Sequence, residues 1–332
     1  MAIEISEKMS KPGVLTEWAS AVVYKNSLTD DQKEISEVID EAVRKIGETG
    51  HDPNHEIASL IQKTFTEESV NAPSELIGRM FDESSIGEFD DFYIETEPKN
   101  TMMAYEATNG GNVPASYIEH NFMKPTWMNL QAETYINMSD MRRGGYHTVA
   151  KHIEFINECF ENRRVAALMN VINNAITADM PGYVAETEAL PGEAAMDELA
   201  LYLHDKVADG EVFMFMLNRY RQAASKLAQA QRWPTEGDKN MYNREGFLNA
   251  YAGVPMLGFS GQKRLADGTL IVPDKTIFGV AGKVGSAVTR GSARVLEEED
   301  INSEKIHVKV AGFTFGYAIT DISKIGKIVM AK

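Results

Sequence analysis

The stretch "IFGVAGKVGS", residues 277–286, has the composition of a phosphate-binding loop, because three glycines recur at every third position from Gly279 and Lys283 follows the second of them. A Walker loop has the pattern G-x-x-x-x-G-K-[ST], in which backbone N–H groups surround the phosphates and a hydroxyl reaches the magnesium ion. If Lys283 were the lysine of this pattern, the first glycine would have to stand at position 277 and the hydroxyl residue at position 284. These positions hold Ile277 and Val284, so the sequence does not match the pattern. The glycines do not match the dinucleotide-binding pattern G-x-G-x-x-G either, because they are spaced G-x-x-G-x-x-G. The spacing therefore favours a glycine-rich turn between two strands.

Four other groups of residues are candidates for chemistry. His51 and His55 could place two imidazoles on one helix face, but no third ligand lies nearby in the sequence. The run "GEFDDFYIETE", residues 87–97, could supply paired carboxylates, although its alternation is more typical of a strand with a solvated acidic face. "GFSG", residues 258–261, misses the spacing of a nucleophile elbow. Cys159 stands among apolar neighbours on a helical pattern, which predicts a buried, inert thiol. We therefore expect no catalytic, cofactor-binding or metal-binding residue and no enzymatic activity.

The composition narrows the classes of protein further. The chain has 332 residues, of which 43% are hydrophobic, and this is enough for one large or two ordinary domains. The formal net charge of −16 disfavours a surface that wraps nucleic acid through phosphate contacts. The single cysteine excludes an intrachain disulfide, and the N-terminus lacks the apolar core of a signal peptide. No run reaches the ~18 apolar residues of a membrane helix. We expect a soluble protein that is intracellular at synthesis.

The first 85 residues are acidic and mostly helical in pattern. Residues 1–28 have too few regularly spaced apolar residues to predict a helix. They are predicted to form an extended arm that becomes ordered when it lies on a neighbouring molecule. One helix face is well formed in the following segment, with Thr29 or Asp30 as its N-terminal cap and Gly47 at its end. Its apolar residues are Ile35, Val38, Ile39, Ala42, Val43 and Ile46. Two shorter amphipathic patterns follow, at residues 57–65 and 76–81.

A long two-stranded finger is predicted next. Residues 91–98 and 101–107 have strand composition and are expected to be joined by a tight Lys-Asn turn. Residues 108–125 are polar at their tip and contain a Gly-Gly pair and two prolines, and residues 126–138 alternate cleanly between apolar and polar side chains. A lone hairpin is marginally stable in water, so this finger requires a surface to lie on.

The longest element follows the finger. Apolar residues step by three and four from Gly145 to about Ala178, and the pattern shifts near Arg163 and Arg164. At 1.5 Å per residue the helix would be roughly 50 Å long, and the shift predicts that its neighbours change along its length. The remainder mixes helices and strands in this order: a helix at 193–208, a strand at 211–217, a helix at 219–231, a polar loop at 233–246, and further strands to the C-terminus.

This order of elements, with the runs "FLNAYAGVPMLGFSG", "VPDKTIFGVAGKVGSAV" and "HVKVAGFTFGYAIT", resembles the major capsid proteins of tailed bacteriophages, which have the Hong Kong 97-type fold. The resemblance covers roughly residues 88–330. It implies an α+β fold with an N-terminal arm, an extended two-stranded loop, a long spine helix, and peripheral and axial domains. The implied parts are an N-terminal arm with helices at 1–85, the extended loop with flanking strands at 86–140, the spine helix with peripheral strands at 141–190 and 285–332, and the axial domain at 191–284.

The resemblance implies a structural function. The chain would be the head protein of a tailed phage, assembling with itself into pentamers and hexamers of an icosahedral shell around double-stranded DNA. Its partners would include portal, scaffolding and decoration proteins, and the packaged DNA would be enclosed without sequence-specific binding. It would be located in the virion, after assembly in the host cytoplasm, with no membrane partner. An encapsulin-type compartment shell and a soluble α+β enzyme remain as alternatives.

The same resemblance indicates which residues contact other subunits. Some family members join a finger lysine covalently to an asparagine of another subunit, but the tip at 108–116 has no lysine, so we do not expect that link. Residues 29–82 are expected to pack on the long helix or a neighbouring subunit and to stay in the mature particle. The interface candidates are Asn109, Gly110, Gly111, Asn112 and Pro114 at the finger tip, Lys124 at its base, Arg142 and Arg143 at the start of the long helix, and Trp233, Asp238 and Arg244 in a loop around a symmetry axis.

Overall fold

The computed structural model describes residues 13–49, 56–64, 75–96, 99–100, 118–119, 121–207, 211–227, 242, 246–262, 264–265, 267–291, 294–300 and 304–331. The helices in these ranges are α1 (Val14–Val23), α2 (Asp30–Thr49), α3 (Glu56–Thr64), α5 (Glu75–Met80), α6 (Met138–Gly144), α7 (Tyr146–Ala175), α8 (Glu193–Lys206), α9 (Asn218–Ala224) and the 3-10 helix η1 (Ile322–Lys324). The strands are β1 (Phe81–Ile86), β2 (Ile94–Glu95), β3 (Lys99–Asn100), β4 (Ile118–Glu119), β5 (Phe122–Met123), β6 (Thr126–Asn137), β7 (Tyr183–Glu186), β8 (Val212–Leu217), β9 (Ala250–Tyr251), β10 (Val254–Phe259), β11 (Thr276–Ala281), β12 (Gly285–Arg290), β13 (Arg294–Asp300), β14 (Lys305–Ile319) and β15 (Ile325–Met330).

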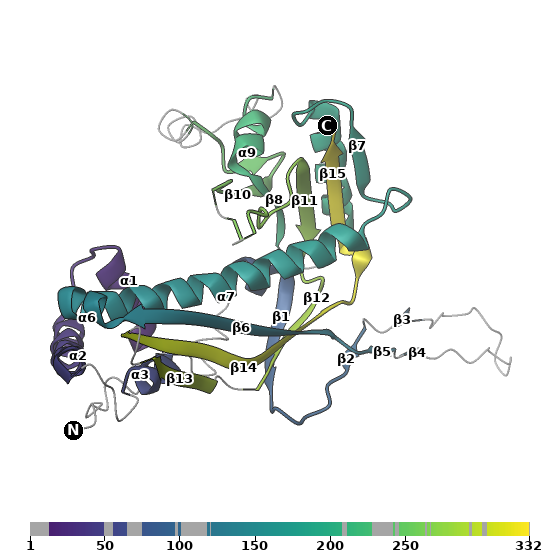
Figure 1. Cartoon of the computed structure of the whole chain (residues 1–332). Coiled ribbons are helices and arrows are strands. Elements are labelled where there is room, and N and C mark those ends of the chain that lie inside the picture. Colours follow the sequence, from purple (N-terminus) through teal and green to yellow (C-terminus); the bar gives the residue numbers. More distant parts are fainter. Residues whose placement is uncertain are drawn as a thin grey trace, which may run out of the picture.

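A five-stranded sheet lies along one side of the long helix α7 (Figure 1). Its strand order is β1-β12-β14-β13, and β6 runs along the other edge of β14. The fifteen residues of β14 allow β13 and β12 to pair with successive parts of one edge, while β6 pairs along the other edge with a register shift between Val310 and Phe313. In β6, Leu130 and Ile136 are buried and the residues between them alternate between exposed and half-buried, which confirms the alternating strand predicted at residues 126–138.

A six-stranded sheet with the order β7-β15-β11-β8-β10-β9 forms the second body, above α7 in Figure 1. The run from Phe213 to Leu217 is buried, because β8 is a central strand of this sheet. The predicted helix at 193–208 and strand at 211–217 are confirmed as α8 and β8. The strands β7 and β15 also pair into this sheet, so residues 183–186 and 325–330 lie with the axial segment and not with the peripheral strands, to which the sequence-based division assigned them.

The long helix is confirmed as α7, whose 30 residues span about 45 Å. Its first half packs against α1 and α2. Arg164 marks the change of neighbours: its side chain is buried, its guanidinium carbon lies 4.4 Å from the centre of the Phe315 ring, and its carbonyl accepts a 3.3 Å hydrogen bond from the Tyr317 hydroxyl. At the far end, Lys327 of β15 donates a 3.0 Å hydrogen bond to the carbonyl of Asn173. The neighbours of the helix therefore change along its length, as the shift in its pattern predicted, and the helix contacts both sheets.

The N-terminal helices pack on this framework. The helix with its cap at Thr29 is confirmed as α2: Gln32 N–H donates to Thr29 Oγ1 over 3.3 Å, and Thr29 N–H donates to Gln32 Oε1 over 3.1 Å. It continues two residues past the predicted end at Gly47. The predicted extended arm at 1–28 is wrong for residues 14–23, which form α1, while residues 1–12 lie outside the described ranges. Trp18 explains the error, because its complete burial depends on packing against distant helices.

The finger differs from its prediction at Lys99 and Asn100 and at residues 91–93, which are irregular, while the strand predicted at 101–107 lies outside the described residues. Lys99 and Asn100, expected to form a tight turn, are strand residues that pair with Ile118 and Glu119. A second short ladder, β2 with β5, lies closer to the sheet. The chain therefore runs out along β2 and β3 and returns along β4 and β5 (Figure 1). A backbone pairing partner almost twenty residues away outweighed the local turn preference of Lys-Asn.

The glycine-rich stretch 277–286 forms β11, a turn and the start of β12, as predicted from its spacing. Gly282 lies in the turn with φ of 74°, a conformation that favours glycine. Lys283, the residue that suggested a phosphate loop, donates through Nζ to the carbonyl of Phe81 over 2.8 Å and to that of Gly78. This lysine therefore holds the junction of α5 and β1 and has a structural role.

His152 gives the fold a dependence on pH that can be tested. It lies on α7 with Nδ1 3.2 Å from the Thr134 hydroxyl of β6, and burial lowers its pKa below the ordinary 6.5, partly offset by the charge of Asp140. The unfolded chain therefore binds the proton more readily than the folded chain, so stability should fall as the pH drops from above 6.5 through the lowered pKa. Urea unfolding from pH 7.5 to 5 should show a shallower loss for His152→Gln than for the wild type. Equal slopes would contradict this assignment.

Candidate contact surfaces

A cavity of about 680 Å³ lies at the start of α7, where α6, α7 and α2 meet. Gly145, with φ of 52° and ψ of −136°, separates α6 from α7 and redirects the chain between them. Asp40 of α2 crosses this break, and its Oδ1 accepts a 3.3 Å hydrogen bond from the N–H of Tyr146. The carboxylate therefore caps the long helix from another helix, and this fixes the shape of the cavity.

Three arginines line this cavity. Arg44 lies 3.8 Å from Glu48, and Arg142 lies 3.5 Å from Glu304. Arg143 is exposed, and it makes no ion pair with any residue that the structure describes. Arg142 and Arg143, predicted from the sequence as interface residues, are therefore brought to one cavity, where Arg142 also has a partner within its own chain. Their contact with another subunit stays a prediction.

The finger base places a second cation on the surface. Lys124 Nζ lies 5.0 Å from the centre of the Tyr93 ring, a distance at which a cation is attracted by the face of the ring. Tyr93 and Phe122 are both exposed large side chains at this base. The remaining predicted interface residues lie outside the described ranges: Asn109, Gly110, Gly111, Asn112, Pro114, Trp233, Asp238 and Arg244.

An acidic turn with an exposed phenylalanine follows β1, where the sequence predicted a strand. Residues 87–93 are irregular because Asp90 closes a turn: its N–H donates to the Gly87 carbonyl over 3.2 Å, and its Oδ2 accepts from the Gly87 N–H over 3.0 Å. Arg294 Nη2 and Glu88 Oε2 are 2.6 Å apart, and this pair braces the turn from β13. Phe89 is 88% exposed. The predicted strand did not indicate this surface, although an aromatic residue between acidic ones in the sequence was a usable signal.

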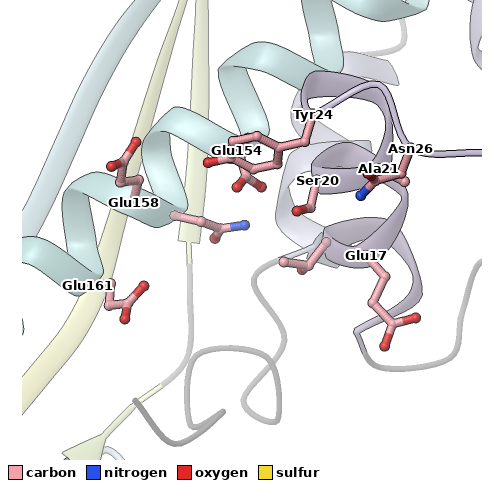
Figure 2. Close-up of a pocket in the computed structure, with 10 residues that line it drawn as sticks. Glu17, Ser20, Ala21, Tyr24, Asn26, Glu154, Glu158 and Glu161 are labelled. Carbon is pink, nitrogen blue, oxygen red and sulfur yellow. The ribbon is translucent and has the colours of Figure 1, made fainter. Parts of the chain in front are cut away.

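A second acidic surface lies between α1 and α7, where side chains from the two helices border a pocket of about 470 Å³ (Figure 2). Burial, with the charges of Glu158 and Glu161, raises the pKa of Glu154. The charge of Glu154, with partial burial, in turn raises the pKa of Tyr24.

Cys159 on the long helix α7 is exposed, so the prediction of a buried thiol is wrong. At 3.6 residues per turn, Cys159 lies about 60° around the helix from the buried Ile156 and therefore outside the face of α7 that packs against the rest of the protein.

Two further kinds of feature, a metal-binding cluster and a membrane-spanning helix, are absent from the described residues. Across these ranges, no three or more His, Cys, Asp and Glu side chains are grouped so that they could hold a metal ion. His51 and His55 lie outside them. Among the helices described, none combines the length and apolar character that a membrane span needs.

Comparison with known proteins identifies the architecture. No protein-family model matches the sequence, and no curated protein matches it. The capsid of a native GTA particle is similar in structure, with a TM-score of 0.55 and 11% identity over 77% of this chain and 90% of that one. The mature capsid of bacteriophage PhiM1 has a TM-score of 0.50 and 12% identity over 75% and 86%. A structure from Microbacterium phage Oxtober96 has a TM-score of 0.50 and 9% identity over 79% and 92%. The chain has the Hong Kong 97-type fold of tailed-phage capsid proteins, as its sequence predicted.

Proposed function

We propose that this chain is the major capsid protein of a tailed phage, which assembles with itself into pentamers and hexamers of an icosahedral shell enclosing double-stranded DNA. Its role in this proposal is structural and not enzymatic. The observation that carries the proposal is the fold, because the capsid structures cover most of this chain and most of their own length. The fold by itself does not determine a function, so the surfaces must support the same conclusion.

The parts that project from the two sheets support self-assembly. The described ladders of the finger, β2 with β5 and β3 with β4, are two residues long and leave Phe122 exposed. Such a ribbon is marginal in water unless another surface covers it. Several modest contacts between copies then add up through multivalency to a stable assembly. We propose that the finger, with Lys124 at its base, lies on a neighbouring copy.

The other parts have assigned places in this proposal. Residues 233–246, with Trp233, Asp238 and Arg244, would contact their symmetry mates around a five-fold or six-fold axis. Residues 29–82 would remain in the mature particle. We keep the four-part domain division, with β7 and β15 moved to the axial part. The wider proposal includes portal, scaffolding and decoration proteins as partners, enclosed DNA without sequence readout, and assembly in the host cytoplasm before residence in the virion.

Microscopy of the purified protein tests the proposal. We expect negative-stain images to show closed particles, tubes or ring-shaped capsomers, and the sedimentation profile to shift toward large species as the protein concentration rises. A uniform small oligomer at every concentration would contradict a shell and favour the enzyme alternative. Closed particles that contain protein cargo and no DNA after expression in the native host would favour a compartment shell.

A further inference from the structure

We propose that the acidic turn after β1 in one copy inserts into the cavity at the start of α7 in a second copy. We call residues 88–91 the acidic knob, and the cavity lined by Arg44, Met141, Arg143 and Tyr146 the basic cavity. Phe89 of the knob would enter the cavity, and Asp91 would face Arg143. The inference rests on the proposed function, since it names one contact through which copies of this chain would assemble.

The acidic knob is built to present its phenylalanine. Single exposed apolar side chains are common on protein surfaces, so the exposure of Phe89 alone carries little weight. This one, however, sits on a turn that is fixed from two sides. The Gly87–Asp90 hydrogen bonds close the turn, and Arg290 Nε donates to the Glu88 carbonyl over 2.5 Å. A pre-ordered anchor loses little conformational entropy when it binds.

The charges of the two surfaces are complementary. The lining of the basic cavity carries three arginines against the two carboxylates Asp40 and Glu48, and Arg44 pairs with Glu48. Arg143 has no ion-pair partner among the described residues, and the same holds for Asp91 on the knob. Joining them would pair one exposed cation with one exposed anion. The acidic pocket between α1 and α7 would instead repel the knob, so the choice of site is selective.

The cavity also suits the size and character of the ring. Its volume of about 680 Å³ lies within the range of pockets that enclose small organic molecules. Tyr146, which is half-buried, lines it and offers apolar atoms to the ring of Phe89, while Met141 also borders it but is buried. An aromatic anchor surrounded by a charged rim is the usual composition of an interface hot spot.

The two surfaces are far apart on one chain. The start of α7 lies at one end of the molecule, whereas the turn after β1 lies below the far part of the five-stranded sheet (Figure 1). They therefore meet only between copies. Because the contact joins two different patches, it is heterologous, and repeating it builds a ring or a continuing lattice instead of a two-fold dimer.

Cross-linking between singly substituted chains tests the contact directly. In a Cys159→Ser background, Asp91→Cys and Arg143→Cys are made as separate proteins, mixed, and treated with a short bis-maleimide reagent. We expect covalent dimers in the mixture and only background levels from either protein alone, since the contact joins unlike patches. Arg163→Cys is the matched control, because Arg163 is exposed on the same helix about 30 Å further along. If Arg143→Cys and Arg163→Cys gave equal yields of cross-linked dimer with Asp91→Cys, the inference would be overturned.

Charge exchange gives a second, independent result. Arg143→Glu, Asp91→Lys and Phe89→Ala should each lower the apparent association constant for assembly at least about tenfold. Combining Arg143→Glu with Asp91→Lys in one chain should recover most of the loss, whereas Arg163→Glu should have little effect. Normal particles from all three single variants would overturn this contact and leave the proposed function intact. A wild-type protein that never assembles would overturn both.

Discussion

Replacing Trp18 with alanine is expected to lower the free energy of unfolding by about 3–5 kcal/mol, the usual cost of truncating a buried tryptophan. Trp18 has no exposed surface, and its Nε1–H donates a 2.9 Å hydrogen bond to the Ser36 hydroxyl of α2. Its ring also lies 6.3 Å from that of Tyr146, in the first turn of α7. One side chain thus joins three helices, and its loss should release α1 and loosen α2. Denaturant unfolding of the unassembled protein, followed by circular dichroism, measures the loss.

The matched control is Tyr24→Ala at the end of the same helix. Tyr24 is 62% exposed, so its removal should change the free energy of unfolding by no more than about 0.5 kcal/mol. Hydrogen exchange should then show residues 14–23 losing protection in Trp18→Ala and keeping it in Tyr24→Ala. If both variants were as stable as the wild type, α1 would not be part of the folded core, and the N-terminal segment would be a separate arm after all.

The second large effect is expected from Gly285→Ala. A Cβ atom at this position would press against the carbonyl oxygen of Ala318 and lie 3.0 Å from the Cα of Ile319, both on the paired strand β14. Backbone atoms in a hydrogen-bonded ladder cannot rotate away as a flexible side chain can. We therefore expect a loss of about 3 kcal/mol or more in the free energy of unfolding, with much of the protein insoluble on expression.

Gly261→Ala is the control for this substitution. A Cβ atom there would meet nothing within 4 Å, and the residue has no positive φ that would strain alanine. It should be neutral, or more stable by up to about 1 kcal/mol, because alanine restricts the unfolded chain. Equal stability of the two variants would mean that β12 and β14 are not in the close register described.

Sequence patterns located the elements whose residues are fixed by local periodicity. Ile35, Ile39 and Val43 repeat on one face over many residues, and this predicted α2 correctly. The same holds for the alternation in β6 and the long run of α7. The misreadings at Lys99 and Trp18 have the opposite cause, because strand pairing and burial there depend on segments far away in the chain.

The contact surfaces were predictable to a smaller extent. Arg142 and Arg143 were predicted as interface residues from their place at the start of the helix, and this stays a prediction; only the fold shows that α2 joins them to form a cavity. Phe89 was hidden inside a pattern that looked like a strand, because the turn that exposes it is set by the Asp90 hydrogen bonds and the arginines of β12 and β13. Side chains from three segments thus determine a surface that no single segment reveals.

The most direct test of the central claim is a cryo-electron microscopy reconstruction of particles assembled from the purified chain. The account predicts closed shells in which this one polypeptide occupies both five-fold and six-fold rings, with the finger lying on a neighbouring copy. A homogeneous small oligomer, or particles without five-fold vertices, would contradict it.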